Sequence, residues 1–332
     1  MHPTNKTYIE FFKMRDLGQV LQVTFLFIRI AFKPLVVGVS MVALPFFLIG
    51  TVLAVSAMDG IFSSSFTQNS NQLASLGGLM IAIFFIGLGS VMLITYVNEL
   101  LKFTSLHPGQ PLPSVHEVWR TTRQYFWWNL LHVVVWFIIL WMYMISVYIV
   151  FILLFLGGIA GAAAGSVFIA AFMGILAFVA FLFLIFYFMA AATPMFFIAT
   201  YEKTNIFNAL SRSFSLLHAT KANFWSGIFT NVLSFFIQFI ISGNILLPAL
   251  IIQWFVQYNS GETMTDETVE MIFKILYGLS YLISPFLFII PLVANGMNYF
   301  NMRERAEGIG LKQRINRIGR QEDFSIEMYE QE

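Results

Sequence analysis

Six long apolar stretches alternate with short polar segments along the chain. A helix needs about 20 apolar residues to cross the hydrocarbon of a bilayer, and each stretch is at least that long. The longest run without an acidic or basic side chain covers 78 residues, from Gln124 to Tyr201, which suffices for two such helices and a turn. The pattern predicts transmembrane helices near Pro34–Ala57, Leu76–Leu101, Leu130–Leu156, Ser166–Thr200, Phe224–Val256 and Ile272–Tyr299.

A shorter segment with an amphipathic helical pattern precedes each pair of stretches, and we term these the elbow segments. In the second, Ser114 and Glu117 have the spacing of a capping box. Such helices lie in the membrane interface or pack on neighbouring spans as cytoplasmic struts, and the pattern allows both. The apolar faces comprise Leu17, Leu21, Phe25 and Ile28 in the first segment, Val115, Val118, Trp119, Thr122 and Phe126 in the second, and Ile206, Phe207, Leu210, Phe214 and Leu217 in the third.

Basic and aromatic residues gather near the end of each elbow segment, where they suit the headgroup level of a bilayer. The recurrence predicts three parallel hairpin repeats, at about 12–101, 113–200 and 204–302, rather than the inverted repeats of many transporters. They would form one membrane domain, 1–302, followed by a basic and then acidic cytoplasmic tail, 303–332. The candidate interfacial residues are Arg120, Arg123, Arg212, Lys221, Trp127, Trp128 and Trp225.

Charge sets the expected orientation. Only 11% of the residues are charged, against about 25% in soluble domains. Seventeen of the eighteen Lys and Arg residues lie at the N-terminus, between the hairpins or in the tail, and the exception is Lys274. The positive-inside rule therefore predicts cytoplasmic termini and outer loops at 58–75, 157–165 and 257–271. The first 16 residues do not resemble a cleavable signal peptide, so the first span is expected to be retained.

The sequence contains no recognisable catalytic chemistry. Cysteine is absent, and so are the zincin, P-loop and nucleophile-elbow motifs. The five histidines have no metal-ligand spacing. We therefore expect no enzymatic activity, cofactor, metal or nucleic-acid partner.

Polar residues within the apolar stretches are the remaining candidates, because ionisable groups in a membrane often carry function. Glu99 lies three residues before Lys102 near a predicted cytoplasmic edge, so we expect an exposed structural ion pair. Amides in spans often join helices, and we favour that role over substrate binding. Gly243 and Pro248 predict a kink or break in the fifth span. The candidates are Asn98, Glu99, Asn231, Gln238, Asn244 and Asn295.

The stretch Ala209–Leu217, followed by Asn223-Phe224-Trp225, resembles a pattern in poorly characterised bacterial six-span membrane proteins. These include the membrane domain attached to some glycerophosphoryl diester phosphodiesterases. The resemblance implies a six-span protein of the bacterial inner membrane with similar elbows. The phosphodiesterase activity of those fusions belongs to a separate soluble barrel, for which this chain has no room. The segment Glu307–Leu311 also resembles tails of related proteins from Bacteroidota.

The leading functional hypothesis is a non-enzymatic inner-membrane scaffold that binds partner proteins or organises the bilayer. Its partners would be the lipid bilayer and other membrane or cytoplasmic proteins. The alternative is a transporter or channel with a pathway between the hairpins, and an intramembrane enzyme ranks third. A transporter predicts a polar cavity at mid-membrane, whereas a scaffold predicts an apolar interior with polar or basic patches at the cytoplasmic face.

Overall fold

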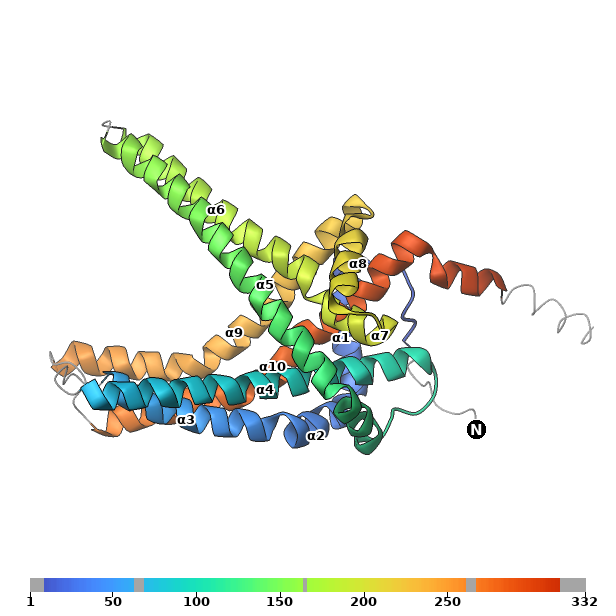
Figure 1. Ribbon diagram of the computed structural model, residues 1–332, viewed down its shortest axis with the longest axis horizontal. Coiled ribbons are helices and arrows are strands. Elements are labelled where there is room, and N and C mark those ends of the chain that lie inside the picture. Colours follow the sequence, from blue (N-terminus) through green and yellow to red (C-terminus); the bar gives the residue numbers. More distant parts are fainter. Residues whose placement is uncertain (1–8, 63–68, 164–165, 261–266, 317–332) are drawn as a thin grey trace, which may run out of the picture. The chain divides into compact units, whose positions relative to one another are not determined.

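The computed structural model describes residues 9–62, 69–163, 166–260 and 267–316, and over these ranges it is all-α (Figure 1). A further short helical segment, 309–316, follows the last long helix. The ten long helices of the described residues are α1 Leu17–Ile30, α2 Phe32–Val42, α3 Leu44–Phe62, α4 Asn69–Leu106, α5 Val115–Ala163, α6 Val167–Ala192, α7 Pro194–Glu202, α8 Ile206–His218, α9 Lys221–Ser260 and α10 Glu267–Glu307.

Five helical segments are long and apolar enough to cross a membrane, and the count is six if the bent pair α1 and α2 forms one span. The protein is therefore a multi-pass membrane protein. The five segments are Ser75–Leu106, Val115–Gly157, Ala171–Glu202, Lys221–Asn244 and Gly278–Glu307.

Proline and helix breaks coincide at two places. The first predicted span is divided at Ala43, two residues before Pro45. Proline has no N–H to continue the helical ladder, and the Phe46 N–H instead bonds the Ala43 carbonyl at 3.1 Å. Pro194 likewise opens α7 directly after α6. By contrast, α9 continues through Pro248, so of the kink or break that we expected there, the break is absent.

The elbow segments differ from one another. α1 meets α2 at an angle of 73°, and α8 is a separate helix that ends before α9. The second elbow segment, however, is continuous with its span in α5 and does not form a separate helix. No proline or glycine occurs between Val115 and Leu156 to interrupt the ladder.

A side chain caps the start of each elbow helix. Asp16 accepts from the Gln19 N–H at 2.7 Å, and Asn205 accepts from the Asn208 N–H at 2.8 Å. The predicted capping box is confirmed, since the Ser114 N–H donates to Glu117 at 2.8 Å. Each cap satisfies a backbone donor that the first turn leaves free.

The contacts divide the chain into two compact units, which share α1, α5, α9 and α10. The first unit takes the described residues within Met1–Thr24, Val134–Val232 and Ala294–Glu332, and the second takes those within Phe25–Val133 and Leu233–Val293.

Close helix contacts hold the second unit together. A Cβ on Gly50 would lie 2.6 Å from Ile86, and one on Gly89 would lie 2.8 Å from the Phe47 ring. Small residues thus let α3 and α4 approach closely, as is usual between membrane helices. In the first unit, an apolar cluster joins α6, α8, α9 and α10 through Ala190, Ala191, Leu217, Ile228 and Met302.

Candidate functional site

A seam of buried asparagines joins α9 to α10 in the first unit. The amide of Asn231 donates to Asn295 at 2.9 Å, and the amide of Asn295 donates back at 3.2 Å. Both side chains are almost fully buried. Two amides with complementary donors and acceptors therefore satisfy each other without water. The structure brings together two candidates that the sequence named separately.

The seam continues along α10 at intervals of three residues. The Ser226 hydroxyl donates to Asn298 at 2.7 Å. Asn301 donates to that hydroxyl at 3.5 Å, and its own oxygen accepts from the Arg15 N–H at 2.8 Å. The seam thus ties the N-terminal segment to α9 and α10.

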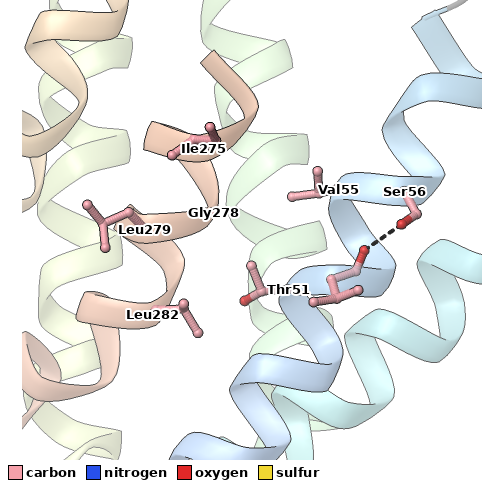
Figure 2. Close-up of a pocket in the computed structure, with 8 residues that line it drawn as sticks. Thr51, Val55, Ser56, Ile275, Gly278, Leu279 and Leu282 are labelled. Atoms are coloured by element: carbon pink, nitrogen blue, oxygen red, sulfur yellow. Dashed lines mark hydrogen bonds between the residues drawn. The ribbon is translucent and has the colours of Figure 1, made fainter. Parts of the chain in front are cut away.

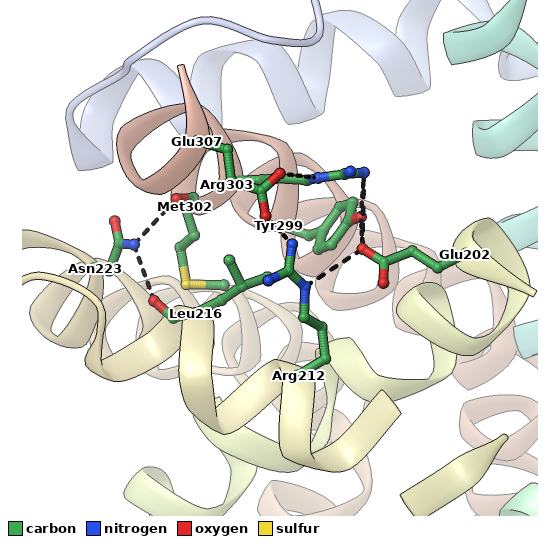
Figure 3. Close-up of polar contacts among 8 residues, drawn as sticks. All are labelled: Glu202, Arg212, Leu216, Asn223, Tyr299, Met302, Arg303 and Glu307. Atoms are coloured by element: carbon green, nitrogen blue, oxygen red, sulfur yellow. Dashed lines mark hydrogen bonds and ion pairs between the residues drawn. The ribbon is translucent and has the colours of Figure 1, made fainter. Parts of the chain in front are cut away.

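Asn223 anchors the end of the elbow helix α8 (Figure 3). Its amide donates to the Leu216 carbonyl at 2.9 Å and to the Met302 carbonyl at 3.1 Å. One fully buried side chain therefore links α8, α9 and α10. This is a structural role for the Asn223-Phe224-Trp225 stretch.

Two arginines and two glutamates form a closed ring of alternating charge, which we term the charge ring (Figure 3). Arg212 contacts Glu202 at 3.7 Å and also pairs with Glu307. Arg303 contacts Glu307 at 2.7 Å and Glu202 at 3.7 Å. Each charge has two opposite neighbours, so the ring fixes the ends of α7 and α10 against α8.

Tyr299 bonds two members of the ring. Its hydroxyl donates to Glu202 at 2.7 Å and accepts from Arg303 at 2.9 Å. The Lys203 backbone, at φ 53°, turns the chain from α7 into α8 directly beside the ring. With both carboxylates paired with guanidinium groups, the arrangement stabilises a helix junction.

The packing face of α8 differs from the predicted one. Its buried residues are Ile206, Ala209, Ser213, Leu216 and Leu217. Phe207, expected on the apolar face, is 66% exposed, and Leu210 and Phe214 are half-buried. α8 packs on α6 and α7, which requires this rotation. α8 therefore packs on its neighbouring helices through one side and leaves the large aromatic side chain of Phe207 exposed on another.

The start of the tail contacts the N-terminal segment, because the Arg305 guanidinium donates to the Arg15 carbonyl. The buried carboxylate of Glu304 accepts from the Gly310 N–H at 2.6 Å and the Leu311 N–H at 3.1 Å. Arg15 donates to the Phe11 carbonyl at 3.0 Å. Burial lowers the pKa of Arg15, and Glu10 opposes that shift. α10 itself ends at Glu307, so the predicted tail begins inside a helix.

The ion pair of Glu99 and Lys102 is present at 3.5 Å, but our expectation that it is exposed is wrong. Only 6% of the Glu99 side chain and 10% of the Lys102 side chain are accessible. Lys102 also lies 5.5 Å from the Tyr125 ring of α5. The three-residue spacing predicted the pair, but α5, which covers it, could not be placed from the sequence.

The other membrane candidates are Asn98 on α4 and two amides on α9. Asn98 is buried on α4, and Gln238 is half-buried on α9 with no hydrogen-bond partner at its Oε1. Asn244 is exposed and donates to the Ile240 carbonyl of its own helix at 2.8 Å.

The interfacial candidates divide into paired and unpaired groups. Arg212 belongs to the charge ring. The others are exposed at the starts of α5 and α9, without an ion pair to any described carboxylate, and they are Arg120, Arg123, Trp127, Trp128, Lys221 and Trp225.

An open groove of about 430 Å³ lies between α3 and α10 in the second unit (Figure 2). Its lining is mostly aliphatic, and the Ser56 hydroxyl is turned to the Val52 carbonyl of its own helix at 2.8 Å. The groove therefore offers apolar contact and few polar contacts. The lining residues are Thr51, Val52, Val55, Ser56, Ile275, Gly278, Leu279 and Leu282.

Sequence reasoning missed most of the seam and the charge ring. The signal for the seam was the spacing of Asn295, Asn298 and Asn301, which places three amides along one side of α10. No comparable signal marks the ring, because Glu202 is distant in sequence from Arg303 and Glu307. Among the described residues, no group of three His, Asp or Glu side chains could hold a metal ion.

Comparisons with protein-family models, with curated proteins and with solved structures find no match to this chain.

Proposed function

We propose that the protein is a non-enzymatic scaffold of a bacterial inner membrane, which binds partner proteins or organises the bilayer around it. In this proposal six spans form three parallel hairpins, both termini are cytoplasmic, and the elbow segments lie at the cytoplasmic face. The resemblance of the third elbow to bacterial six-span proteins and the distribution of Lys and Arg support this arrangement.

The observation that carries the proposal is the mutual pairing of two buried amides and of four charged side chains in the first unit, where the Nδ2 of Asn298 and the Oδ1 of Asn223 are left without a hydrogen-bond partner. Asn231 and Asn295 satisfy each other, and the charges of the ring compensate one another. A transport pathway would need polar groups that face an aqueous or substrate-filled space. The groove between α3 and α10 is instead mostly apolar, so these features favour a scaffold over the transporter or channel alternative.

The charge ring supplies a rigid surface for a partner. Its four charged side chains are between 22% and 34% accessible, so they reach the surface while they hold three helices. A protein that docks here would meet a fixed pattern of charges, and charge complementarity gives such contacts specificity.

Affinity purification of the full-length protein in mild detergent, with quantitative mass spectrometry, tests the proposal. We expect a partner at a constant ratio to the wild-type chain, retained by Lys312→Gln and lost with Arg212→Ala. Lys312 is exposed and outside the ring, so it is the matched charge control. The absence of such a partner, together with ion conductance in planar bilayers bathed in potassium chloride, would favour the channel alternative.

A further inference from the structure

The N-terminal part of α5 carries an exposed stripe that changes from polar to apolar along the helix axis. His116, Arg120, Arg123, Trp127 and Leu131 are all exposed. At 3.6 residues per turn, they fall within about 80° of the helix circumference. Trp127 is 75% exposed and Leu131 is 53% exposed. The order of base, indole and aliphatic side chain matches the order of headgroup, interface and acyl chain in a bilayer.

The opposite side of this part of α5 packs against α4. Asn129 donates to Thr95 of α4 at 3.1 Å, and the Tyr125 ring lies beside Lys102. Val118 and Thr122 are buried on that side as well. Contact with α4 therefore fixes the rotation of α5 and directs the stripe away from this neighbour.

The two arginines of the stripe are available for an anion. Neither guanidinium lies within ion-pair distance of a described carboxylate, although Arg120 interacts with Glu117 electrostatically at longer range. The nearest acidic residue in sequence, Glu117, is held by Ser114, whose N–H and hydroxyl donate to it at 2.8 Å and 3.0 Å. This distinguishes the pair from Arg212 and Arg303, whose charges are compensated in the ring.

We propose that Arg120 and Arg123 bind the phosphate of an anionic phospholipid whose acyl chains lie along Trp127 and Leu131. Guanidinium groups bind phosphate oxygens in a bidentate manner, and side chains three positions apart on a helix are neighbours. Leu131 lies about 12 Å beyond Arg123 along the axis, within the reach of an acyl chain.

An anionic headgroup is favoured because no headgroup cation compensates its phosphate, unlike that of phosphatidylcholine. The inference deepens the proposed function, on which it rests for the position of this segment at the cytoplasmic leaflet, by naming the lipid class that the protein would gather. The start of α9 offers the same order of base and indole with one cation, Lys221, one turn before Trp225.

The absence of native cysteine allows a local test with the full-length protein in vesicles. A bimane fluorophore at Leu131→Cys reports the lipid beside the stripe, and one at Ile83→Cys reports an exposed position on α4. Quenching is compared between phosphatidylcholine vesicles that contain brominated phosphatidylglycerol and vesicles that contain brominated phosphatidylcholine. Arg120→Gln, Arg123→Gln and the double variant are measured at Leu131→Cys, with Lys221→Gln as the matched charge control.

We expect preferential quenching by phosphatidylglycerol at Leu131→Cys and little preference at Ile83→Cys. Each arginine variant should lower the preference at Leu131→Cys about fivefold or less, the double variant should abolish it, and Lys221→Gln should preserve it. Equal preference at both positions, or a preference that survives the double variant, would overturn the proposal. Inorganic phosphate and chloride are also added to the vesicles at equal ionic strength. A greater loss of the quenching preference with phosphate than with chloride would overturn the proposal in favour of a soluble anion. A scaffold that fails the partner test can still show the lipid preference, so the two failures are distinguishable.

Discussion

The pair of Asn231 and Asn295 shows how single polar residues hold two membrane helices together. Each amide has an NH₂ group that donates and an oxygen that accepts. The NH₂ group of each residue donates to the oxygen of the other. In a buried site, loss of one partner costs more than loss of both, because the remaining amide keeps its desolvation cost.

This reciprocity predicts a non-additive mutational response. Asn231→Leu alone should lower the free energy of unfolding by about 1–3 kcal/mol, and the double variant with Asn295→Leu should lose less than the sum of the two single variants. Reversible unfolding in mixed micelles measures the three variants. Strictly additive effects would contradict direct pairing of the two amides.

The buried ion pair of Glu99 and Lys102 predicts a larger effect than an exposed pair would. Glu99→Gln removes the Glu99 charge from the buried Lys102 ammonium, and breaking a buried ion pair in this way costs about 3–5 kcal/mol. We expect reduced thermal stability and a lower protein level, with partial recovery in Glu99→Gln/Lys102→Gln. Asn244→Ala, at an exposed amide, is the control and should be mild. Equal stability of Glu99→Gln and the wild type would show that the pair is solvated.

Individual residues show which contacts could be predicted from the sequence and which could not. Residue type alone indicated that Asn231 and Asn295 join helices, but not that they join each other, since 64 positions separate them. The spacing of Glu99 and Lys102 indicated an ion pair, whereas its burial depends on α5. The sequence spacing therefore predicted local contacts, but it did not predict which side chains are buried by tertiary packing.

At the scale of elements, apolar length placed the last five spans, whereas the first predicted span, Pro34–Ala57, does not match the bent pair α1 and α2 that could form a sixth. The apolar stretches correspond to α2–α3, α4, α5, α6–α7, α9 and α10. The break at Ala43 and the continuity of α5 depend on local hydrogen bonding that hydropathy does not encode. The rotated face of α8 has a different cause, because its contact with α6 and α7 decides which side is buried.

The turn into the tail helix predicts two glycine-specific effects. Gly308 adopts φ +62°, a conformation that costs a residue with a Cβ about 1 kcal/mol. A Cβ on Gly310 would lie 2.3 Å from the Phe12 carbonyl oxygen. Gly308→Ala and Gly310→Ala should therefore speed hydrogen exchange in 309–316, more strongly for Gly310→Ala.

Gly87→Ala is the matched control, because a Cβ there meets no atom within 4 Å. It should leave exchange in 309–316 unchanged. Unchanged exchange in Gly310→Ala as well would contradict the close approach of the tail to the N-terminal segment.

At the scale of the whole molecule, the charge distribution predicts orientation. Single cysteines at Gly161 and Ser260 should react with an impermeant thiol reagent added to intact cells, because both lie at the outer ends of proposed hairpins. Gln110→Cys, in an exposed segment between α4 and α5, should react only after the membrane is permeabilised. Labelling of Gln110→Cys in intact cells would reverse the proposed topology.

The central claim is that polar groups within the first unit join helices rather than line a pathway. The reactivity of a cysteine placed in the seam tests this most directly. Ser226 is a buried serine of the seam, and cysteine is nearly isosteric with serine, so Ser226→Cys is the variant to use. The rate of modification by a small cationic thiol reagent in open membranes is compared with that of Gln110→Cys. The account predicts almost no reaction at Ser226→Cys while Gln110→Cys reacts fully, and similar rates at the two positions would contradict it.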